Sequence, residues 1–233
     1  MNVAAAPRDF ERNLEKWRWT PTSQGHPSKP PDRFTEIPGH NNYRGGAINS
    51  YEQLMMLKNK YKIRTVVNLA RDSMKHQPSR PIPCGGIRGD ACEPKWAAAL
   101  GLKYIAAYLG HSPPSAAKWA EIREALADGG VYIHCSAGVD RTGAAVARWR
   151  KEITPPGELS DADLLSYTRH FGGYWRNHRD YRQTKNKELG DWALQGRYNS
   201  SLAARALRPR GGVLPGLAVF AVGLFVFFRL RQS

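Results

Sequence analysis

Apolar and polar residues alternate along the middle of the chain in two patterns. Strands are predicted at residues 64–69, 102–106 and 131–133, and the first and last of these are expected to be buried. Helices are predicted over residues 50–61, 94–100 and 142–153. In the first and the last of these ranges, apolar residues recur at helical spacing. Ser112 is expected to cap a further helix that begins with Pro113 and Pro114.

Strands that alternate with helices in this way predict an α/β fold built on one central sheet. Such connections favour parallel strands, so we expect a mostly parallel sheet flanked by helices. The carboxyl ends of parallel strands share one edge of the sheet, and catalytic loops gather there. Residues 71–93, rich in Pro, Gly and charge, are predicted to form a long loop near that edge.

Composition divides the chain into four parts. Residues 1–33 form an N-terminal extension with a Pro-rich linker and lack the apolar stretch of a signal peptide. The alternating elements occupy residues 34–172, which are expected to form the folded domain. A basic, aromatic-rich extension follows at residues 173–210, and an apolar segment at residues 211–230.

The apolar segment is predicted to be a C-terminal transmembrane helix. Residues 213–228 carry no charge, and flanking apolar residues extend the run toward the roughly 20 residues that span a bilayer. The run is apolar on every face, which argues against a helix on the membrane surface and leaves a buried core helix as the alternative. Basic residues precede it, as on a cytoplasmic flank, so we expect a membrane tail anchor with the catalytic domain in the cytoplasm.

An excess of basic residues indicates an anionic partner. The net charge is +15 and the pI is about 10.0, which suits a phosphorylated substrate, an acidic membrane or nucleic acid. A solvated basic surface is the alternative. Arg and Lys alternate with Tyr and Trp in the extension at residues 173–210, a pattern that suits a lipid interface or single-stranded nucleic acid. A helix packed on the core through its aromatic residues explains this pattern equally well.

The candidate chemistry lies in the stretch HCSAGVDRTG, residues 134–143, between a predicted strand and a predicted helix. In such a unit the loop amides and the helix N-terminus form a cradle for an anion. Cys135 lies at the base of the cradle, where positive partial charge lowers the pKa of a thiol and makes it a nucleophile. Arg141 closes the loop with a planar guanidinium that binds two phosphoryl oxygens. His134 is expected to orient the loop by hydrogen bonding.

The backbone between the cysteine and the arginine is expected to bind phosphate. Small residues leave room for the anion to approach the amides. Thr142 is predicted to cap the following helix and to offer its hydroxyl to the thiolate. The predicted phosphate-binding residues are Ser136, Ala137, Gly138, Val139, Asp140, Arg141 and Thr142.

This stretch resembles the signature of the cysteine-dependent phosphatases, which is His-Cys, five residues, Arg, then Ser or Thr. Residues 41–72, in which Tyr-Arg-Gly precedes a helix and a strand ending in Val-Val-Asn-Leu, are similar to the opening of the compact dual-specificity-like members. Residues 113–126 resemble their helix before the catalytic strand. The resemblance implies a dual-specificity-phosphatase-like fold and hydrolysis of phosphomonoesters through a cysteinyl-phosphate, with no metal or other cofactor.

The acid that related enzymes use is missing from its usual place. They carry an aspartate just before the helix that precedes the catalytic strand, but residues 106–115 contain no Asp or Glu. Asp140 is one candidate, because its Asp-Arg-Thr order resembles that of myotubularin-like phosphoinositide phosphatases; bracing the loop is its alternative role. His111 is an alternative acid, with an ordinary pKa near 6.5. A leaving group that needs no acid, such as a polyphosphate end, is the third explanation.

Three function classes follow. The first is a membrane-tethered protein tyrosine/dual-specificity-like phosphatase that acts on a phosphoinositide, another phospholipid or a phosphoprotein. The second is an RNA 5′-phosphatase, favoured by the charge but not by the apolar segment. The third is a catalytically weak phosphate-binding pseudophosphatase, favoured by the absent loop acid. Cys84 and Cys92 are either incidental loop cysteines, or one of them forms a disulfide with Cys135 under oxidation.

Overall fold

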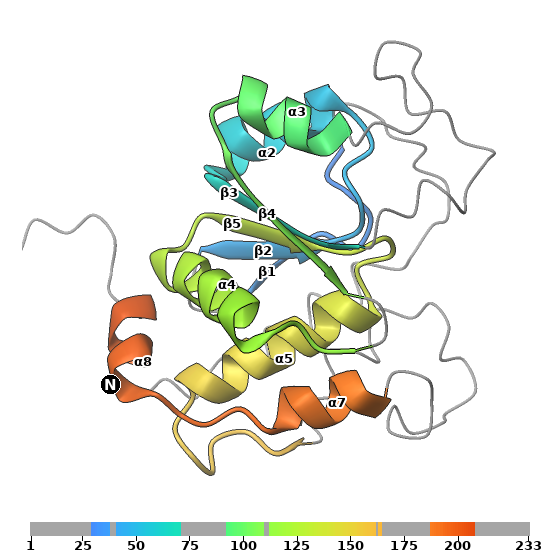
Figure 1. The fold of residues 1–233 in the computed structure, drawn as a ribbon. Helices are drawn as coiled ribbons and strands as arrows, with labels where there is room; N and C mark the ends of the chain where they lie inside the picture. Colours follow the sequence, from blue (N-terminus) through green and yellow to red (C-terminus); the bar gives the residue numbers. More distant parts are fainter. Residues whose placement is uncertain are drawn as a thin grey trace, which may run out of the picture.

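Five strands form one sheet among the residues that the structure describes, and helices cover both of its faces (Figure 1). The structure is a computed structural model that describes residues 29–37, 41–70, 92–109, 112–161, 163–164 and 187–207. The strands lie in the order β1-β2-β5-β3-β4. Their bounds are β1 (Thr35–Ile37), β2 (Asn42–Gly45), β3 (Thr65–Ala70), β4 (Lys103–Leu109) and β5 (Val131–His134).

The central strand is β5, which pairs in parallel with β2 on one side and with β3 on the other. Gly45 and Asn68 therefore both lie opposite His134. β4 is parallel to β3, whereas β1 runs antiparallel to β2. The predicted α/β fold is confirmed, with a mixed sheet. Because β5 is central and wholly buried, the residues after it emerge in the middle of one edge of the sheet.

The helices form layers on the two faces of the sheet (Figure 1). α2 and α3 lie on one face, and α4 and α5 lie on the other. α7 packs against α5, and α8 packs against both α4 and α5, so these two helices form an outer layer. The bounds are α2 (Tyr51–Tyr61), α3 (Cys92–Ala99), α4 (Ala116–Asp128), α5 (Asp140–Ile153), α7 (Lys187–Leu194) and α8 (Ser200–Ala206).

Each face of the sheet has its own apolar core. Val66 and Tyr132 belong to the core under α2 and α3, whereas their chain neighbours Val67 and Ile133 belong to the core under α4 and α5. Successive side chains of a strand point to opposite faces. A strand covered on both faces therefore needs apolar residues at successive positions, such as Val66 and Val67 in β3 or Tyr132 and Ile133 in β5, and this pattern located both strands in the sequence.

The start of α4 differs from the prediction. Ser115, and not Ser112, caps this helix, because its Oγ accepts a hydrogen bond from the backbone N–H of Lys118 at 3.2 Å. Pro114 disfavours a helical conformation at the residue before it, so the helix begins only after the proline pair. The Ser112 hydroxyl instead donates to the Glu188 carboxylate at 2.9 Å.

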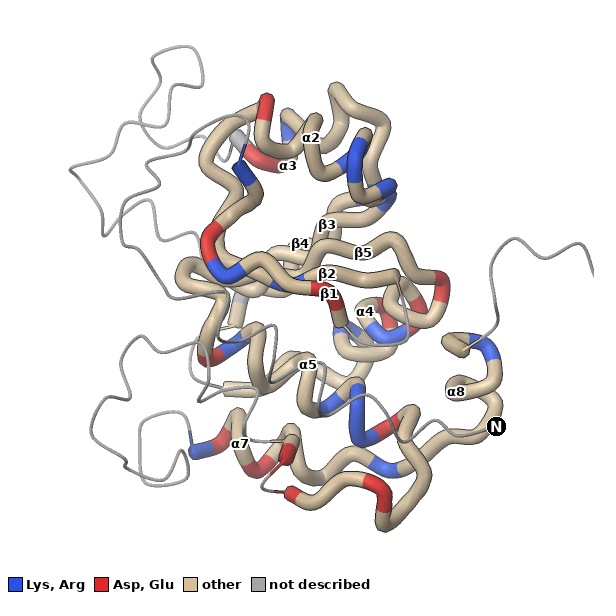
Figure 2. Tube along the Cα trace, turned by 180° about the vertical axis from the view of Figure 1, so that it is seen from behind, with Lys and Arg blue, Asp and Glu red and all other residues tan. Residues whose placement is uncertain are grey.

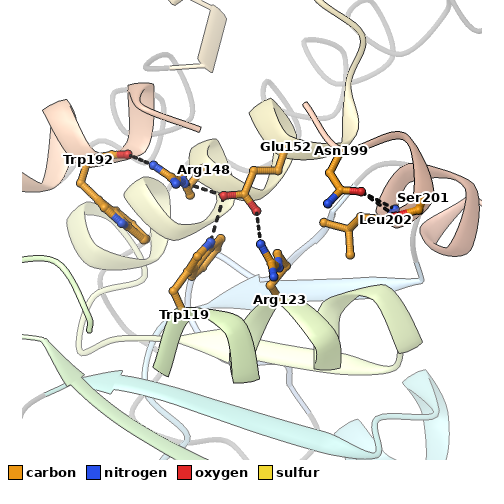
Figure 3. A network of polar contacts seen from close by, with 8 residues as sticks. All are labelled: Trp119, Arg123, Arg148, Glu152, Trp192, Asn199, Ser201 and Leu202. Carbon is orange, nitrogen blue, oxygen red and sulfur yellow. Dashed lines mark hydrogen bonds and ion pairs between the residues drawn. The ribbon is translucent and has the colours of Figure 1, made fainter. Parts of the chain in front are cut away.

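A buried carboxylate near the end of α5, that of Glu152, connects three helices (Figure 3). Its Oε1 accepts hydrogen bonds from Trp119 Nε1 of α4 at 3.0 Å and from Arg148 Nε at 2.6 Å. Arg148 Nη1 donates to the Trp192 carbonyl of α7 at 2.7 Å. The rings of Trp119 and Trp192 meet edge to face, with centroids 5.0 Å apart. The Glu152 carbonyl also accepts from the Asn199 N–H at 2.8 Å, which holds the turn before α8.

Residues 187–207, which composition places in an extension, thus pack on the domain. Leu189, Ala193 and Leu202 join the core that lies under α4 and α5. Of the two aromatic side chains in this range, Trp192 packs on Trp119, whereas Tyr198 is exposed. The remaining residues of the extension lie outside the described part of the chain.

Several predicted features fall on residues that the structure does not describe. They are the apolar segment at residues 213–228, residues 1–28, residues 71–91 of the predicted loop, Cys84 and His111. Within the described ranges, each helix is too short or too polar to cross a bilayer. The membrane anchor stays a prediction of the sequence.

Replacing Leu189 by Ala tests whether α7 belongs to the folded domain. The side chain is fully buried, so Leu189→Ala should lower the free energy of unfolding by about 2–5 kcal/mol, through lost burial and the cavity left behind. Chemical denaturation followed by tryptophan fluorescence measures this change. The control is Leu207→Ala, at a side chain that is 50% exposed, which should change the value by less than about 0.5 kcal/mol. Equal values for the two variants would contradict the packing of α7.

Candidate active site

Cys135 directly follows β5, and the chain then turns back through four residues into α5. The Cys135 side chain is buried, whereas Ser136 and Ala137 at the tip of the turn are exposed. The N-terminus of α5 therefore lies directly after the turn that begins with the thiol. A helix N-terminus carries unpaired N–H groups and partial positive charge, so this turn is suited to bind an anion.

Two arginines from distant parts of the chain hold the carbonyls of this turn. Arg33 Nη1 donates to the Ala137 carbonyl at 2.7 Å, and the fully buried Arg44 donates through Nη2 to the Gly138 carbonyl at 2.5 Å. In a planar trans peptide the C=O and N–H bonds point in opposite directions. The next N–H groups along the chain, those of Gly138 and Val139, are thereby directed away from the arginines, which forms an anion-binding concavity of amides.

The turn packs closely on the end of β2. A Cβ atom added to Gly138, whose φ is +70°, would lie 2.4 Å from the carbonyl carbon of Gly45. The Ala47 N–H donates to the Ser136 carbonyl at 3.1 Å, and the Gly46 N–H donates to the Asp32 carbonyl at 2.7 Å. Glycine at position 138 is therefore required both for its backbone angle and for the close approach of two main chains.

The environment of Cys135 favours the thiolate. Burial alone raises the pKa of the thiol, but the Arg141 guanidinium, the Thr142 hydroxyl and the N–H groups of Thr142 and Gly138 outweigh it, so that the pKa lies below its ordinary value. Thr142 Oγ1 is buried without a partner of good hydrogen-bond geometry, yet it is near enough to the sulfur to contribute. Thr142 therefore lies near the nucleophile, and a hydrogen bond from its hydroxyl to the thiolate stays a prediction. Its predicted capping role is wrong, because Val139 is the N-cap and no side chain caps α5.

Arg141 lies at the opening of the site. Its Nη1 donates to the Leu109 carbonyl at the end of β4 at 3.2 Å, and its Nη2 donates to Ser136 Oγ at 3.3 Å. The guanidinium thus bridges the turn and the end of β4. Because a guanidinium has five N–H donors, further ones are available for two oxygens of a bound phosphoryl group.

His134 is buried beneath the turn and contacts an acidic residue of α3. Its Nε2 lies 2.6 Å from Glu93 Oε1, and its Nδ1 lies 3.3 Å from the Cys135 carbonyl oxygen. Burial lowers the pKa of His134, but the Glu93 carboxylate and the contacts with Cys135 raise it above the ordinary value overall. The predicted orienting role of His134 thus has a physical basis in the hydrogen bond to Cys135.

Asp140 is the first residue of α5 and lies within electrostatic range of Arg33. Burial lowers the pKa of Arg33, while the charges of Asp32, Cys135 and Asp140 oppose that change. Asp140 therefore lies close to the reacting groups, and its carboxylate is also suited to brace Arg33. His111, the alternative acid, lies outside the described residues.

Nothing in the sequence indicated two charged residues of this site, Arg33 and Glu93, or the function of Arg44. Arg33 is 104 positions from its partner Ala137, and Glu93 is 41 positions from His134. No local pattern marks either residue. The Tyr-Arg-Gly sequence was the one available signal, and it indicated a family without indicating what the arginine contacts.

Charges of both signs are interspersed over the described residues (Figure 2). Most of the excess of Lys and Arg in the sequence thus falls outside them. Within the described part of the chain, no cluster of three or more His, Cys, Asp or Glu side chains is placed to hold a metal ion. Anion binding in this part of the chain depends on the local arrangement around Cys135.

Comparison with known proteins gives one family and a shared fold. Residues 40–185, more than half of the chain, match the family described as DSP-PTPase phosphatase fused to NAD+ kinase. The structure is similar to the core catalytic domain of the PP-IP phosphatase SIW14 from S. cerevisiae (TM-score 0.50, 16% identity, 72% of this chain and 87% of that chain). It is also similar to a PTP-like phytase from Bdellovibrio bacteriovorus (TM-score 0.50, 12% identity, 79% of this chain and 87% of that chain). At such identities the likeness shows the fold, and no curated protein matches the sequence.

Replacing Gly138 by Ala tests the anion cradle. The added methyl group collides with the end of β2, so the turn must shift and its N–H groups no longer point toward the bound anion. A hydrogen bond to a charged oxygen contributes about 1.5–3 kcal/mol, so we expect Gly138→Ala to weaken vanadate binding about tenfold or more by calorimetry. The matched control is Gly157→Ala, where φ is +90° but no atom lies within 4 Å of the new Cβ. If Gly138→Ala binds vanadate as tightly as the unmodified chain, the amides of this turn do not form the anion-binding site.

Proposed function

Because this chain belongs to the family described as DSP-PTPase phosphatases fused to NAD+ kinase, we propose that it hydrolyses phosphomonoesters through a cysteinyl-phosphate intermediate. The observation that carries the proposal is the buried Cys135 thiol, whose pKa is lowered by Arg141 and by the amides of the turn. A thiolate within an anion cradle is the arrangement that covalent phosphoryl transfer requires.

The reaction proceeds in two steps. The turn binds a phosphomonoester dianion, and the Cys135 thiolate attacks phosphorus in line, so that an S–P bond forms and the bond to the leaving oxygen breaks. Arg141 and the amides of the turn stabilise the charge on the equatorial oxygens. Water then attacks the cysteinyl-phosphate, which releases inorganic phosphate and regenerates the thiolate. Neither step consumes an oxidant or a reductant.

Asp140 is proposed as the acid that protonates the leaving oxygen. It lies at the first position of α5, one residue before Arg141, so its backbone is held by the same turn that binds phosphate. The neighbouring Arg33 supports the alternative in which Asp140 braces the loop. The two roles predict different kinetics. Removing an acid slows the reaction most for substrates with poor leaving groups, whereas removing a brace slows all substrates equally.

The proposed substrates are phosphorylated inositols, either free or as lipid headgroups. The net charge of +15 favours a ligand that carries more than one phosphate, and Arg141 and the amides of the turn are suited to bind one of these phosphates. The two similar structures named above are a PP-IP phosphatase and a phytase, and both names refer to inositol phosphates. A second candidate, the 5′-triphosphate end of RNA, is favoured by the net charge of +15.

A phosphate-release panel with the full chain tests this substrate class. Its arms are soluble inositol polyphosphates, phosphoinositides in vesicles, phosphotyrosine peptides and RNA with a 5′-triphosphate. We expect the highest kcat/KM on an inositol phosphate, and the first two arms distinguish the free from the lipid-bound form. Preference for a phosphopeptide or for RNA would overturn the substrate proposal while leaving the reaction intact.

Substitutions of the two central residues test the reaction itself. Cys135→Ser should abolish turnover but retain vanadate binding, because the cradle remains and the nucleophile is lost. Arg141→Lys should lower kcat/KM about 100-fold, since a point charge cannot replace the planar fork. The matched control is Arg197→Lys, at an exposed arginine outside the site, which should leave kcat/KM unchanged. Substantial turnover by Cys135→Ser would refute a cysteinyl-phosphate.

The role of Asp140 is tested by leaving-group dependence. If Asp140 is the acid, Asp140→Asn should slow hydrolysis of alkyl phosphates by roughly 10²–10⁴-fold. Aryl phosphates with good leaving groups need little protonation and should be slowed far less. Steady-state kinetics on both substrate types measures the difference. A uniform loss on both would assign Asp140 to bracing, and the leaving-group pattern in His111→Gln instead would assign the acid to His111.

A further inference from the structure

His134 is held between two groups that accept hydrogen bonds. On one side its Nε2 lies 2.6 Å from a carboxylate oxygen of Glu93, and on the other its Nδ1 lies 3.3 Å from the Cys135 carbonyl. The His134 side chain is 1% exposed and that of Glu93 is 12% exposed, so little water competes for either contact. The Tyr132 ring stacks on the imidazole, with centroids 5.5 Å apart.

These partners determine the protonation that satisfies the ring. A carbonyl oxygen can only accept a hydrogen bond, and so can an ionised carboxylate. Both nitrogens of His134 must then carry a hydrogen, which makes the ring an imidazolium. Glu93 lies in the first turn of α3, where the helix N-terminus favours a negative side chain.

We propose that Glu93 is a positioning residue for the nucleophile, which keeps His134 doubly protonated so that His134 holds the Cys135 carbonyl and places a positive charge beside the thiolate. The proposal rests on the proposed function in one respect, namely that Cys135 is the reacting group. Nothing in the 134–143 stretch indicates Glu93, which comes from the opposite side of the sheet from α5.

The positions of Glu93, His134 and Cys135 determine whether this pair raises or lowers the pKa of the thiol. Glu93 alone would disfavour a thiolate, but His134 lies between the carboxylate and the Cys135 backbone, so the nearer charge is positive. Of the described groups, Glu93 and Cys135 are those that raise the pKa of His134 by charge. Arg141, from α5, acts on the thiolate independently of this pair.

The rate of Cys135 alkylation by iodoacetamide, measured against pH in the full chain, tests the proposal. Peptide mass spectrometry separates Cys135 from Cys84 and Cys92. We expect Glu93→Gln to move the midpoint to higher pH by about 1 unit or more, because an opposite charge is lost from beside His134. Glu93→Asp should move it less. The matched control is Glu52→Gln, an exposed glutamate in the first turn of α2, which should leave the profile unchanged.

A second measurement on the unmodified chain stands whether or not the variant folds. The ¹⁵N chemical shifts of His134 near pH 7 should show both ring nitrogens protonated. A neutral ring, or an alkylation profile of folded Glu93→Gln that coincides with that of the unmodified chain, would overturn the proposal. Alkylation needs no turnover, so a chain inactive on every phosphate but with the shifted profile would refute the proposed function and support the role of Glu93.

Discussion

The candidate site depends on two arginine side chains that hold the carbonyls of the turn after β5. Arg33 and Arg44 bind the oxygens of Ala137 and Gly138, and the planarity of the peptide then directs the following N–H groups the other way. Without these donors, the carbonyls would compete with the amides for the concave side. Preorganised amides need no rearrangement when charge develops on a phosphoryl group, which is what electrostatic catalysis requires.

The turn is fixed by the two elements that it connects, β5 before it and α5 after it. At its start, Cys135 leaves β5, the central strand, which is hydrogen-bonded on both sides. At its end, α5 is enclosed by the sheet and by α7 and α8, with the buried Glu152 binding Trp119 and Arg148. A nucleophile and an anion-binding helix N-terminus are thereby joined to two rigid elements. Residues 187–207 contribute to that rigidity through packing.

Charge in the site is arranged so that each cation has a distinct task. Arg33 and Arg44 face carbonyls and shape the turn, Arg141 faces the opening, and His134 lies below the cysteine paired with Glu93. The thiol is buried, and burial by itself opposes ionisation. Arg141, the Thr142 hydroxyl and the N–H groups of Thr142 and Gly138 outweigh burial, so the pKa of Cys135 lies below its ordinary value.

The sequence by itself determined the α/β fold, most of its elements and the Cys135–Arg141 pair, because periodicity and a six-residue spacing are local properties of a chain. Its errors were local too: the proline pair moved the start of α4 to Ser115, and Thr142 caps nothing. Only the tertiary structure decided which charges surround the thiol. Arg33 and Glu93 reach the site across 104 and 41 positions, and such contacts depend on strand order, which no local pattern encodes.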